Sequence, residues 1–255
     1  NANAANAKHG LEVSSRARKV ATIRSFYKYL VSKAKLLEEN PIQELDSPKI
    51  RQALPRYLTL DESIQLLESI DGDNAERDFC IITLFLNCGL RISELVGLDL
   101  SDIRGDRLRV LGKGNKERVV YLNAACQSAI EDWLAVRSQS GAADPNALFI
   151  SRRHTRITKD GVHYMLKQRF TAAGLDSSKY SAHKLRHTAA TLMLQNGVDV
   201  RTLQEVLGHE HLNTTQIYTH VDSDALQNAA QSNPLGQIKT KPRRGRPKNI
   251  PPDEA

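Results

Sequence analysis

Six polar side chains in this sequence are of types that together could cut a phosphodiester bond. Two arginines can clamp the non-bridging oxygens of a phosphate and stabilise the charge of a five-coordinate transition state. A tyrosine hydroxyl can act as the nucleophile, and because a phenol has a pKa of about 10, a histidine is a suitable acceptor for its proton. A lysine can return a proton to the leaving oxygen. The six residues are Arg91, Lys113, His183, Arg186, His209 and Tyr218.

Taken singly, each of these residues has an ordinary structural explanation. Tyr218 follows a suitable helix N-cap, Asn213, among polar neighbours, and it could be a tyrosine at the rim of the protein. Lys113 lies between two glycines and could be a solvated turn. His183 and Arg186 are three residues apart and could form a surface hydrogen bond. It is the combination that favours phosphoryl chemistry, and since the carboxylates of a two-metal site are missing, the arginines would take the place of metal ions.

The segments that precede the first of these residues have helical patterns. Residues 14–39 carry apolar side chains at three- and four-residue steps and predict an amphipathic helix that Asn40 ends. Thr59 and Glu62 have the spacing of a capping box at the start of a second helix. Gly89 is placed to end the next helix in a left-handed turn, just before the first of the two arginines.

A β signal separates these helices from those that follow. Residues 107–122, RLRVLGKGNKERVVYL, predict a hairpin of two short strands with Lys113 at its tip. Helical patterns return from Thr158 onward and are broken by three glycines. These are Gly174, Gly197 and Gly208. The predicted fold class is therefore mainly α with a small β-sheet or hairpin, an α+β fold.

Composition favours a basic protein that acts on a polyanion. The chain has 255 residues and a formal net charge of +7, which favours nucleic acid first and an anionic membrane surface second. No apolar run approaches the roughly 20 residues of a membrane span, and the start lacks a signal peptide's apolar stretch, so a cytoplasmic protein without membrane attachment is expected. Cys80, Cys88 and Cys126 lie in apolar helical patterns and are predicted to be reduced core thiols. Neither a cofactor nor a metal is expected.

Four strings around the six residues resemble the tyrosine recombinase (phage integrase) family, and in particular its Xer-like branch. The strings are CGLRISEL, VLGKGNKERVVYL, AHKLRHTAATLML and LGHEHLNTTQIYTHV, in that order. The resemblance runs from about residue 15 to about residue 235, and the last two strings are highly specific for the family. All six polar positions match the family pattern.

The resemblance implies a role for each of the six residues. Arg91 and Arg186 would bind the phosphate, with His183 assisting as general acid or base. Lys113 would protonate the leaving 5′ oxygen, His209 would contact the phosphate, and Tyr218 would be the nucleophile. Glu94, His187 and His220 also match recurring family strings, and we interpret Glu94 as a helix-starting or supporting residue and the two histidines as support.

The activity implied is a site-specific DNA recombinase or integrase. It would cleave and rejoin duplex DNA by metal-independent transesterification through a 3′-phosphotyrosyl intermediate. The implied partners are double-stranded DNA with a specific recombination site and further subunits, either four copies on two DNA sites or a related recombinase. Residues 222–235, with Leu226, Ala229, Ala230 and Leu235 on their apolar side, would dock on a neighbouring subunit. A nicking and closing enzyme like topoisomerase IB and a non-catalytic DNA-binding accessory protein remain alternatives.

The resemblance also suggests a division of the chain into domains. Residues 1–47 would be the C-terminal part of a helical core-binding (SAM-like) domain, residues 48–57 a linker, and residues 58–235 the catalytic domain. Because the chain starts with Asn and only the final helix or two of the first domain can be recognised, a fragment of a longer protein is expected.

The last part, residues 236–255, is predicted to be a disordered tail. It contains KPRRGRPKN, which resembles an AT-hook that lies in the minor groove of A·T-rich DNA. The tentative DNA-binding residues of the tail are Arg243, Arg244, Arg246 and Lys248. An ordinary solvated basic tail would have much the same composition.

Overall fold

The chain divides into two compact units, residues 1–55 and residues 56–255. The computed structural model describes residues 13–46, 48, 57–208 and 223–237. Within these ranges, none of the helices combines the length and the apolar character that a membrane crossing requires.

The described residues of unit 1 contain one long helix, α1 (Val13–Ser32). The sequence predicted a helix over residues 14–39, and this prediction is wrong at its C-terminal end. Lys35 adopts a left-handed backbone conformation with φ of +51°, and the amide of Leu36 donates to the carbonyl of Leu30 at 2.9 Å. A left-handed residue just after the last turn ends a helix even when that residue is not glycine.

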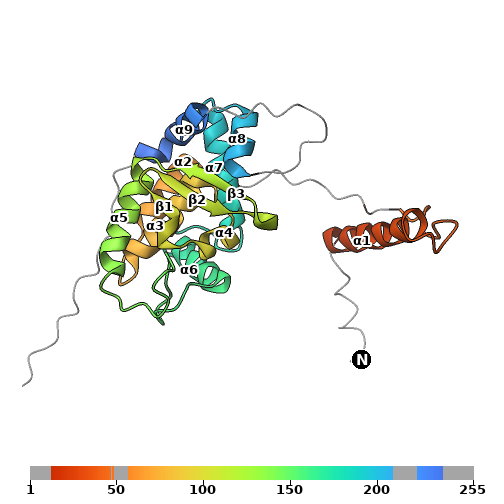
Figure 1. Cartoon of the computed structure of the whole chain (residues 1–255), viewed down its shortest axis with the longest axis horizontal. Coiled ribbons are helices and arrows are strands. Elements are labelled where there is room, and N and C mark those ends of the chain that lie inside the picture. The colour runs from red at the N-terminus through yellow and green to blue at the C-terminus, as the bar shows by residue number, and fades with distance from the viewer. Residues whose placement is uncertain (1–12, 47, 49–56, 209–222, 238–255) are drawn as a thin grey trace, which may run out of the picture. The chain divides into compact units, whose positions relative to one another are not determined.

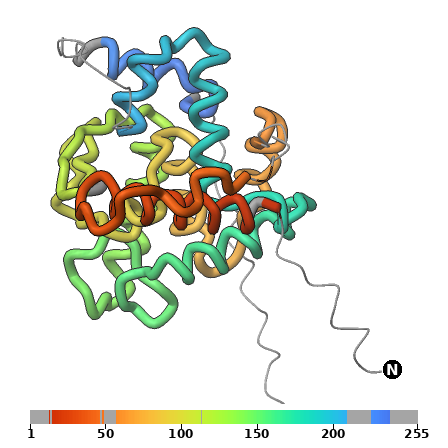
Figure 2. The backbone as a smooth tube through the Cα atoms, turned by 90° about the vertical axis from the view of Figure 1, so that its right-hand side faces the viewer, coloured from red at the N-terminus to blue at the C-terminus, as the bar shows by residue number. Residues whose placement is uncertain are grey.

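Unit 2 contains eight further α-helices among its described residues, together with a three-stranded sheet. The helices are α2 (Leu60–Glu68), α3 (Ala75–Cys88), α4 (Ile92–Gly97), α5 (Ala124–Arg137), α6 (Lys159–Ala172), α7 (Ala182–Gln195), α8 (Val200–Leu207) and α9 (Ser223–Gln231). The strands are β1 (Ile103–Arg104), β2 (Arg107–Leu111) and β3 (Glu117–Tyr121), and three 3₁₀ turns are η2 (Leu100–Asp102), η3 (Lys113–Asn115) and η4 (Pro234–Gln237). In Figures 1 and 2, α6 lies toward one end of the unit, and α8 and α9 lie together at the other. The predicted fold class, mainly α with a small sheet, is confirmed.

Local sequence signals place several helix ends of unit 2. Thr59 and Glu62 form the predicted capping box at the start of α2, with the Thr59 side chain accepting from the Glu62 amide at 3.1 Å and Glu62 accepting from the Thr59 amide at 2.8 Å. Gly89 ends α3 with φ of +58°, as predicted. The predicted breaks at Gly174, Gly197 and Gly208 are also left-handed glycines.

The sheet is antiparallel, with strand order β1-β2-β3. Strands β2 and β3 form the predicted hairpin, and the backbone of Lys113 lies in η3 between them. Side chains alternate between two faces of a strand. In β3 the buried Val120 and the half-buried Arg118 share the inward face, and Arg118 pairs in register with the buried Val110 of β2.

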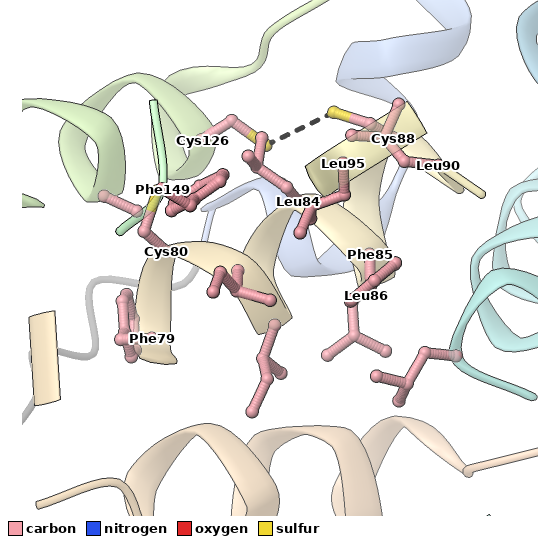
Figure 3. Packing of buried hydrophobic residues seen from close by; sticks show 14 of the residues in the cluster. Phe79, Cys80, Leu84, Phe85, Leu86, Cys88, Leu90, Leu95, Cys126 and Phe149 are labelled. Carbon is pink, nitrogen blue, oxygen red and sulfur yellow. Dashed lines mark hydrogen bonds between the residues drawn. The ribbon is translucent and has the colours of Figure 1, made fainter. Parts of the chain in front are cut away.

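Helix α3 is the centre of the core, because all of its residues are buried. It packs against α5 on one side and α7 on another. Figure 3 shows the cysteines among these apolar side chains, where the Sγ atoms of Cys88 and Cys126 lie 3.8 Å apart. Cys80 is buried nearby, and burial raises the pKa of its thiol well above the usual value. The cysteines are therefore free core residues, as predicted.

The C-terminal segment packs on its own chain. Helix α9 contacts α8 and β3, and η4 contacts α2, α3 and α5. Ala229, Ala230 and Leu235 are buried there, and the side chain of Asn123 donates to the carbonyl of Ala230 at 3.1 Å. The apolar side that the sequence assigned to a neighbouring subunit is thus covered within this unit. The turn η4 extends to Gln237, two residues past the predicted end of the catalytic domain.

Candidate active site

Arg91 occupies the corner between α3 and α4. It is the N-cap of α4, two residues after the left-handed Gly89. The apolar residues around it, Leu90 and Leu95, are fully buried in the core (Figure 3), so the backbone of the corner is fixed while about a third of the Arg91 side chain stays exposed. A rigid backbone with a partly exposed arginine side chain is suited to binding an anion.

Glu94 is the buried carboxylate at this corner. Its side chain is 2% exposed, and each of its two oxygens accepts two hydrogen bonds. Arg91 supplies its backbone amide at 2.8 Å and its Nη1 at 2.7 Å, while Arg118 supplies Nη1 at 2.8 Å and Nη2 at 2.9 Å. Burial alone would raise the pKa of Glu94, but the hydrogen bonds from Arg118 and Arg91 outweigh it and lower the pKa. Glu94 therefore both starts α4 and fixes two arginines.

Arg186 reaches the same corner from α7. The sequence predicted a buried stripe of Leu185, Ala189 and Leu192 on this helix, and all three are buried. Arg186 itself is also buried, and its Nη1 donates to the carbonyl of Gly89. The same Nη1 lies 4.0 Å from a Glu94 oxygen.

The C-terminus of α8 joins the three arginines. Three consecutive carbonyls there accept one hydrogen bond each from a different arginine. Val206 accepts from Nε of Arg118 at 3.3 Å, Leu207 accepts from Nη2 of Arg186 at 2.6 Å, and Gly208 accepts from Nη2 of Arg91 at 2.8 Å. The last carbonyls of a helix lack intrahelical partners and carry partial negative charge, so cations satisfy them well.

The cluster of Arg91, Arg118, Arg186 and Glu94 carries more positive than negative charge. Among the described residues of the cluster, three guanidinium groups face one carboxylate, so the cluster carries two more positive than negative charges. Burial, with repulsion from Arg91 and Arg118, lowers the pKa of Arg186 to about 10, although it stays charged at neutral pH. A bound anion would relieve this repulsion, so the cluster is suited to a phosphate.

The loop that carries Lys113 begins at this cluster. The amide of Gly112 donates to the carbonyl of Lys116 at 2.8 Å and closes the base of the hairpin. A Cβ atom placed on Gly112 would lie 3.8 Å from Oε1 of Glu94 and 3.7 Å from Nη1 of Arg118. The backbone immediately before Lys113 therefore lies against the Glu94 carboxylate.

The structure places the other predicted residues as follows. His183 is exposed in the first turn of α7, one turn before Arg186. His187 makes an edge contact with Tyr57, with 5.9 Å between ring centroids, and burial followed by the charges of Lys184 and His183 lowers its pKa. His209, Tyr218 and His220 lie outside the described residues, as do the tail residues Arg243, Arg244, Arg246 and Lys248. His209 follows directly after Gly208, the residue whose carbonyl binds Arg91.

Arg118 is the member of the cluster that sequence reasoning missed. It belongs to the same string as Lys113, five residues further along, and the alternation of β3 puts it on the inward face with Val120. A basic residue on the inward face of a strand requires a buried partner. That signal was present in the sequence, but it does not identify Glu94, which is 24 residues away.

Gly89 allows α3 and α8 to approach each other at the cluster. A Cβ atom at this position would lie 2.5 Å from Cδ2 of Leu207, and its φ of +58° disfavours any L side chain. Gly89→Ala is therefore expected to lower the free energy of unfolding by roughly 2–4 kcal/mol, the sum of left-handed strain and overpacking. Urea denaturation measures this loss.

The matched control is Gly72→Ala. Gly72 also has positive φ, +86°, but a Cβ atom there meets no atom of the described residues within 4 Å. Only the backbone cost of about 1–2 kcal/mol is expected for it. Equal losses for the two variants would show that the approach of Leu207 to Gly89 does not matter for stability.

Comparisons with known proteins relate the chain to one family. Residues 56–224 match the model of the phage integrase family. The chain is 58% identical over 224 residues to tyrosine recombinase XerC of Caldanaerobacter subterraneus subsp. tengcongensis, covering 88% of this chain and 64% of that protein. It is 39% identical over 241 residues to tyrosine recombinase XerC of Vibrio cholerae, covering 92% of this chain and 76% of that one. The chain thus spans about two thirds to three quarters of the length of these relatives.

Solved structures of recombinases share the fold. XerH site-specific recombinase bound to palindromic difH substrate, a post-cleavage complex, matches with a TM-score of 0.67 and 27% identity over 87% of this chain and 68% of that one. A lambda integrase dimer bound to a COC′ core site matches with a TM-score of 0.59 and 18% identity over 82% of this chain and 77% of that one, and at this identity it shows the fold alone. By its matched domain and its XerC relatives, the chain belongs to the phage integrase family of tyrosine recombinases.

Proposed function

We propose that this chain is a site-specific DNA strand transferase that cuts and rejoins duplex DNA through a covalent bond to Tyr218. The observation that carries the proposal is the cluster of three arginines around one buried carboxylate, whose described members carry two more positive than negative charges, with Arg91 partly exposed. Phosphate is the anion that such a fork of guanidinium groups suits best. The chain's relatives are named tyrosine recombinases, which supports the same reaction.

In the proposed reaction the Tyr218 hydroxyl oxygen attacks phosphorus, and the bond from phosphorus to the 5′ oxygen breaks. Arg91 and Arg186 bind the non-bridging oxygens and stabilise the added negative charge of the transition state. His183 takes part in transfer of the phenol proton, and Lys113 gives a proton to the leaving 5′ oxygen. His209 makes a further contact to the phosphate. The 3′-phosphotyrosyl bond keeps the energy of the cleaved bond, so a 5′ hydroxyl can reverse the step.

The proposed partner is duplex DNA that contains a specific recombination site. XerH, a structural neighbour of 27% identity, was solved bound to its difH substrate, which supports a DNA partner for this fold. We further propose that four subunits, identical or related, act on two sites. Because α9 and η4 are covered within their own unit, assembly would use other surfaces or would exchange this segment between subunits.

Covalent capture of DNA tests the function. The protein is incubated with a pool of nicked duplexes of randomised sequence, with EDTA present, and complexes that resist SDS are recovered and amplified over several rounds. A nick beside the cleavage position lets the short strand diffuse away and traps the covalent bond. We expect enrichment of one sequence, whose protein–DNA complex is sensitive to protease; we refer to this DNA as the captured duplex.

Two other outcomes would contradict the proposal. Non-covalent binding without any SDS-resistant complex would indicate a DNA-binding accessory protein. Covalent capture without sequence enrichment, together with relaxation of any supercoiled plasmid, would indicate a nicking and closing enzyme.

A further inference from the structure

Arg118 makes several hydrogen bonds in the cluster but has none of the roles proposed for the six predicted site residues. Its side chain is 14% exposed, and all three of its guanidinium nitrogens donate hydrogen bonds. Nη1 and Nη2 bind the two oxygens of Glu94, and Nε binds the carbonyl of Val206. Because these bonds occupy both edges of its guanidinium group, Arg118 is fixed between Glu94 and the end of α8.

The way in which Arg118 binds Glu94 limits what Arg91 can do. Arg118 takes one hydrogen-bonding site on each carboxylate oxygen. Arg91 is left with the second site on Oε1 for its Nη1, while its own backbone amide occupies the second site on Oε2. Arg91 therefore binds the carboxylate through a single guanidinium nitrogen, although an arginine fork readily pairs with both oxygens of a carboxylate.

We propose that Arg118 is a positioning residue that prevents Glu94 from neutralising Arg91 and so keeps the Arg91 guanidinium available to the DNA phosphate. This inference rests on the proposed function. Without Arg118, the freed sites on Glu94 would be filled by the nearest cation, Arg91, which would turn its fork toward the carboxylate and away from the phosphate. Arg118 belongs to strand β3 of the hairpin that carries the Lys113 loop, so its hydrogen bonds to Glu94 tie the hairpin to the arginine corner.

Arg118→Lys is the informative variant because it retains the positive charge and removes the planar fork. A lysine ammonium is a point donor and cannot fill one site on each oxygen with fixed geometry. At saturating captured duplex, single-turnover cleavage by Arg118→Lys is expected to be slower by roughly 10²-fold, the size of effect that a misplaced group can cause, while DNA affinity changes little.

Arg169→Lys is the matched control for stability. Arg169 has the same side-chain exposure, 14%, and binds the buried Asp78 through Nε and Nη2, and Asp78, like Glu94, has a second arginine partner, Arg77. Both lysine variants are expected to lose similar stability in urea denaturation. Well below the melting temperature, Arg169→Lys is expected to cleave at the wild-type rate, so a slow Arg118→Lys variant reflects positioning and not loss of fold.

A double-mutant cycle shows whether Arg118 acts through Arg91. If it does, adding Arg118→Lys to Arg91→Ala should slow cleavage by less than about threefold beyond Arg91→Ala alone, because the group that Arg118 positions is already gone. A further loss as large as in the wild-type background would overturn the inference. A wild-type cleavage rate for Arg118→Lys alone would overturn it as well.

A measurement without DNA separates this inference from the proposed function. In ¹⁵N NMR spectra of the guanidinium groups, rotation about the Cζ–Nη bonds of Arg91 is expected to slow in Arg118→Lys, as Arg91 pairs with both oxygens of Glu94, and to be unchanged in Arg169→Lys. If the wild-type protein captures no DNA but the rotation of the Arg91 guanidinium still slows in Arg118→Lys, the proposed function fails. The inference that Arg118 limits the pairing of Arg91 with Glu94 then stands. If the wild type cleaves and Arg91 does not respond, the inference fails alone.

Discussion

Replacing Tyr218 with phenylalanine is expected to abolish the covalent complex with the captured duplex while leaving DNA affinity and stability almost unchanged. The substitution removes one hydroxyl oxygen, which is the proposed nucleophile, and keeps the ring. No other group would then supply the oxygen that bonds to phosphorus. SDS gel electrophoresis of the nicked substrate measures the complex, and a mobility shift in native gels measures the affinity.

Tyr164→Phe is the control for this experiment. Tyr164 lies on α6, is 64% exposed, and its hydroxyl accepts a hydrogen bond from Gln168 at 2.9 Å. Its loss is expected to leave the covalent complex at the wild-type level. A covalent complex that persists in Tyr218→Phe would overturn the assignment of the nucleophile.

The second large effect is expected at Arg91. Arg91→Ala should slow cleavage by roughly 10²–10³-fold, equivalent to about 3–4 kcal/mol of lost transition-state stabilisation, because a preorganised cation at the phosphate is removed. The fold should survive, since the side chain is 34% exposed and the backbone amide that Glu94 caps remains. Single-turnover rates on the captured duplex measure the loss.

A substrate with sulfur in place of the bridging 5′ oxygen separates Arg91 from Lys113. A thiolate leaves without needing a proton, so this substrate is expected to restore cleavage by Lys113→Ala. It should not restore Arg91→Ala, because the charge on the non-bridging oxygens still lacks its partner. Equal rescue of the two variants would show that the proposed division of roles is wrong.

Features that depend on a few neighbouring residues could be predicted from the sequence. The capping box of Thr59 and Glu62 and the left-handed turn at Gly89 follow from local backbone chemistry. The hairpin over residues 107–122 follows from β-branched strands around a glycine-rich turn. The strand β1 was not predicted, because two residues are too short to show an alternation.

The end of α1 could not be predicted in the same way. The apolar periodicity continues past Ser32, but the chain turns at Lys35, where a non-glycine residue takes the left-handed position. Lysine at that position carries no sequence signal, since glycine or asparagine usually marks it. The helix was therefore predicted seven residues too long.

The contacts of the arginine cluster are tertiary and lie beyond sequence reasoning. Arg91 and Arg186 were predicted to share a phosphate, and the structure brings them to one corner through Gly89, Glu94 and the end of α8. Their pairing with consecutive backbone carbonyls has no sequence signature. The roles of these residues in catalysis stay predictions.

The surface that covers the C-terminal segment could not be predicted from the sequence either. Its apolar positions were identified correctly, since Ala229, Ala230 and Leu235 are buried. An apolar stripe indicates that a surface is covered and does not say which surface covers it. In this structure the covering surface is formed by the same chain.

The central claim, that DNA becomes bonded to Tyr218, is tested most directly by locating the nucleotide on the protein. The wild-type complex with the captured duplex is digested with nuclease and trypsin and analysed by tandem mass spectrometry. Cleavage after Arg201 and Lys239 releases residues 202–239, in which Tyr218 is the single tyrosine. We expect the nucleotide mass on this peptide, with fragment ions that assign it to Tyr218. A nucleotide on any other residue, including Ser223 or Ser232 of the same peptide, would contradict the account.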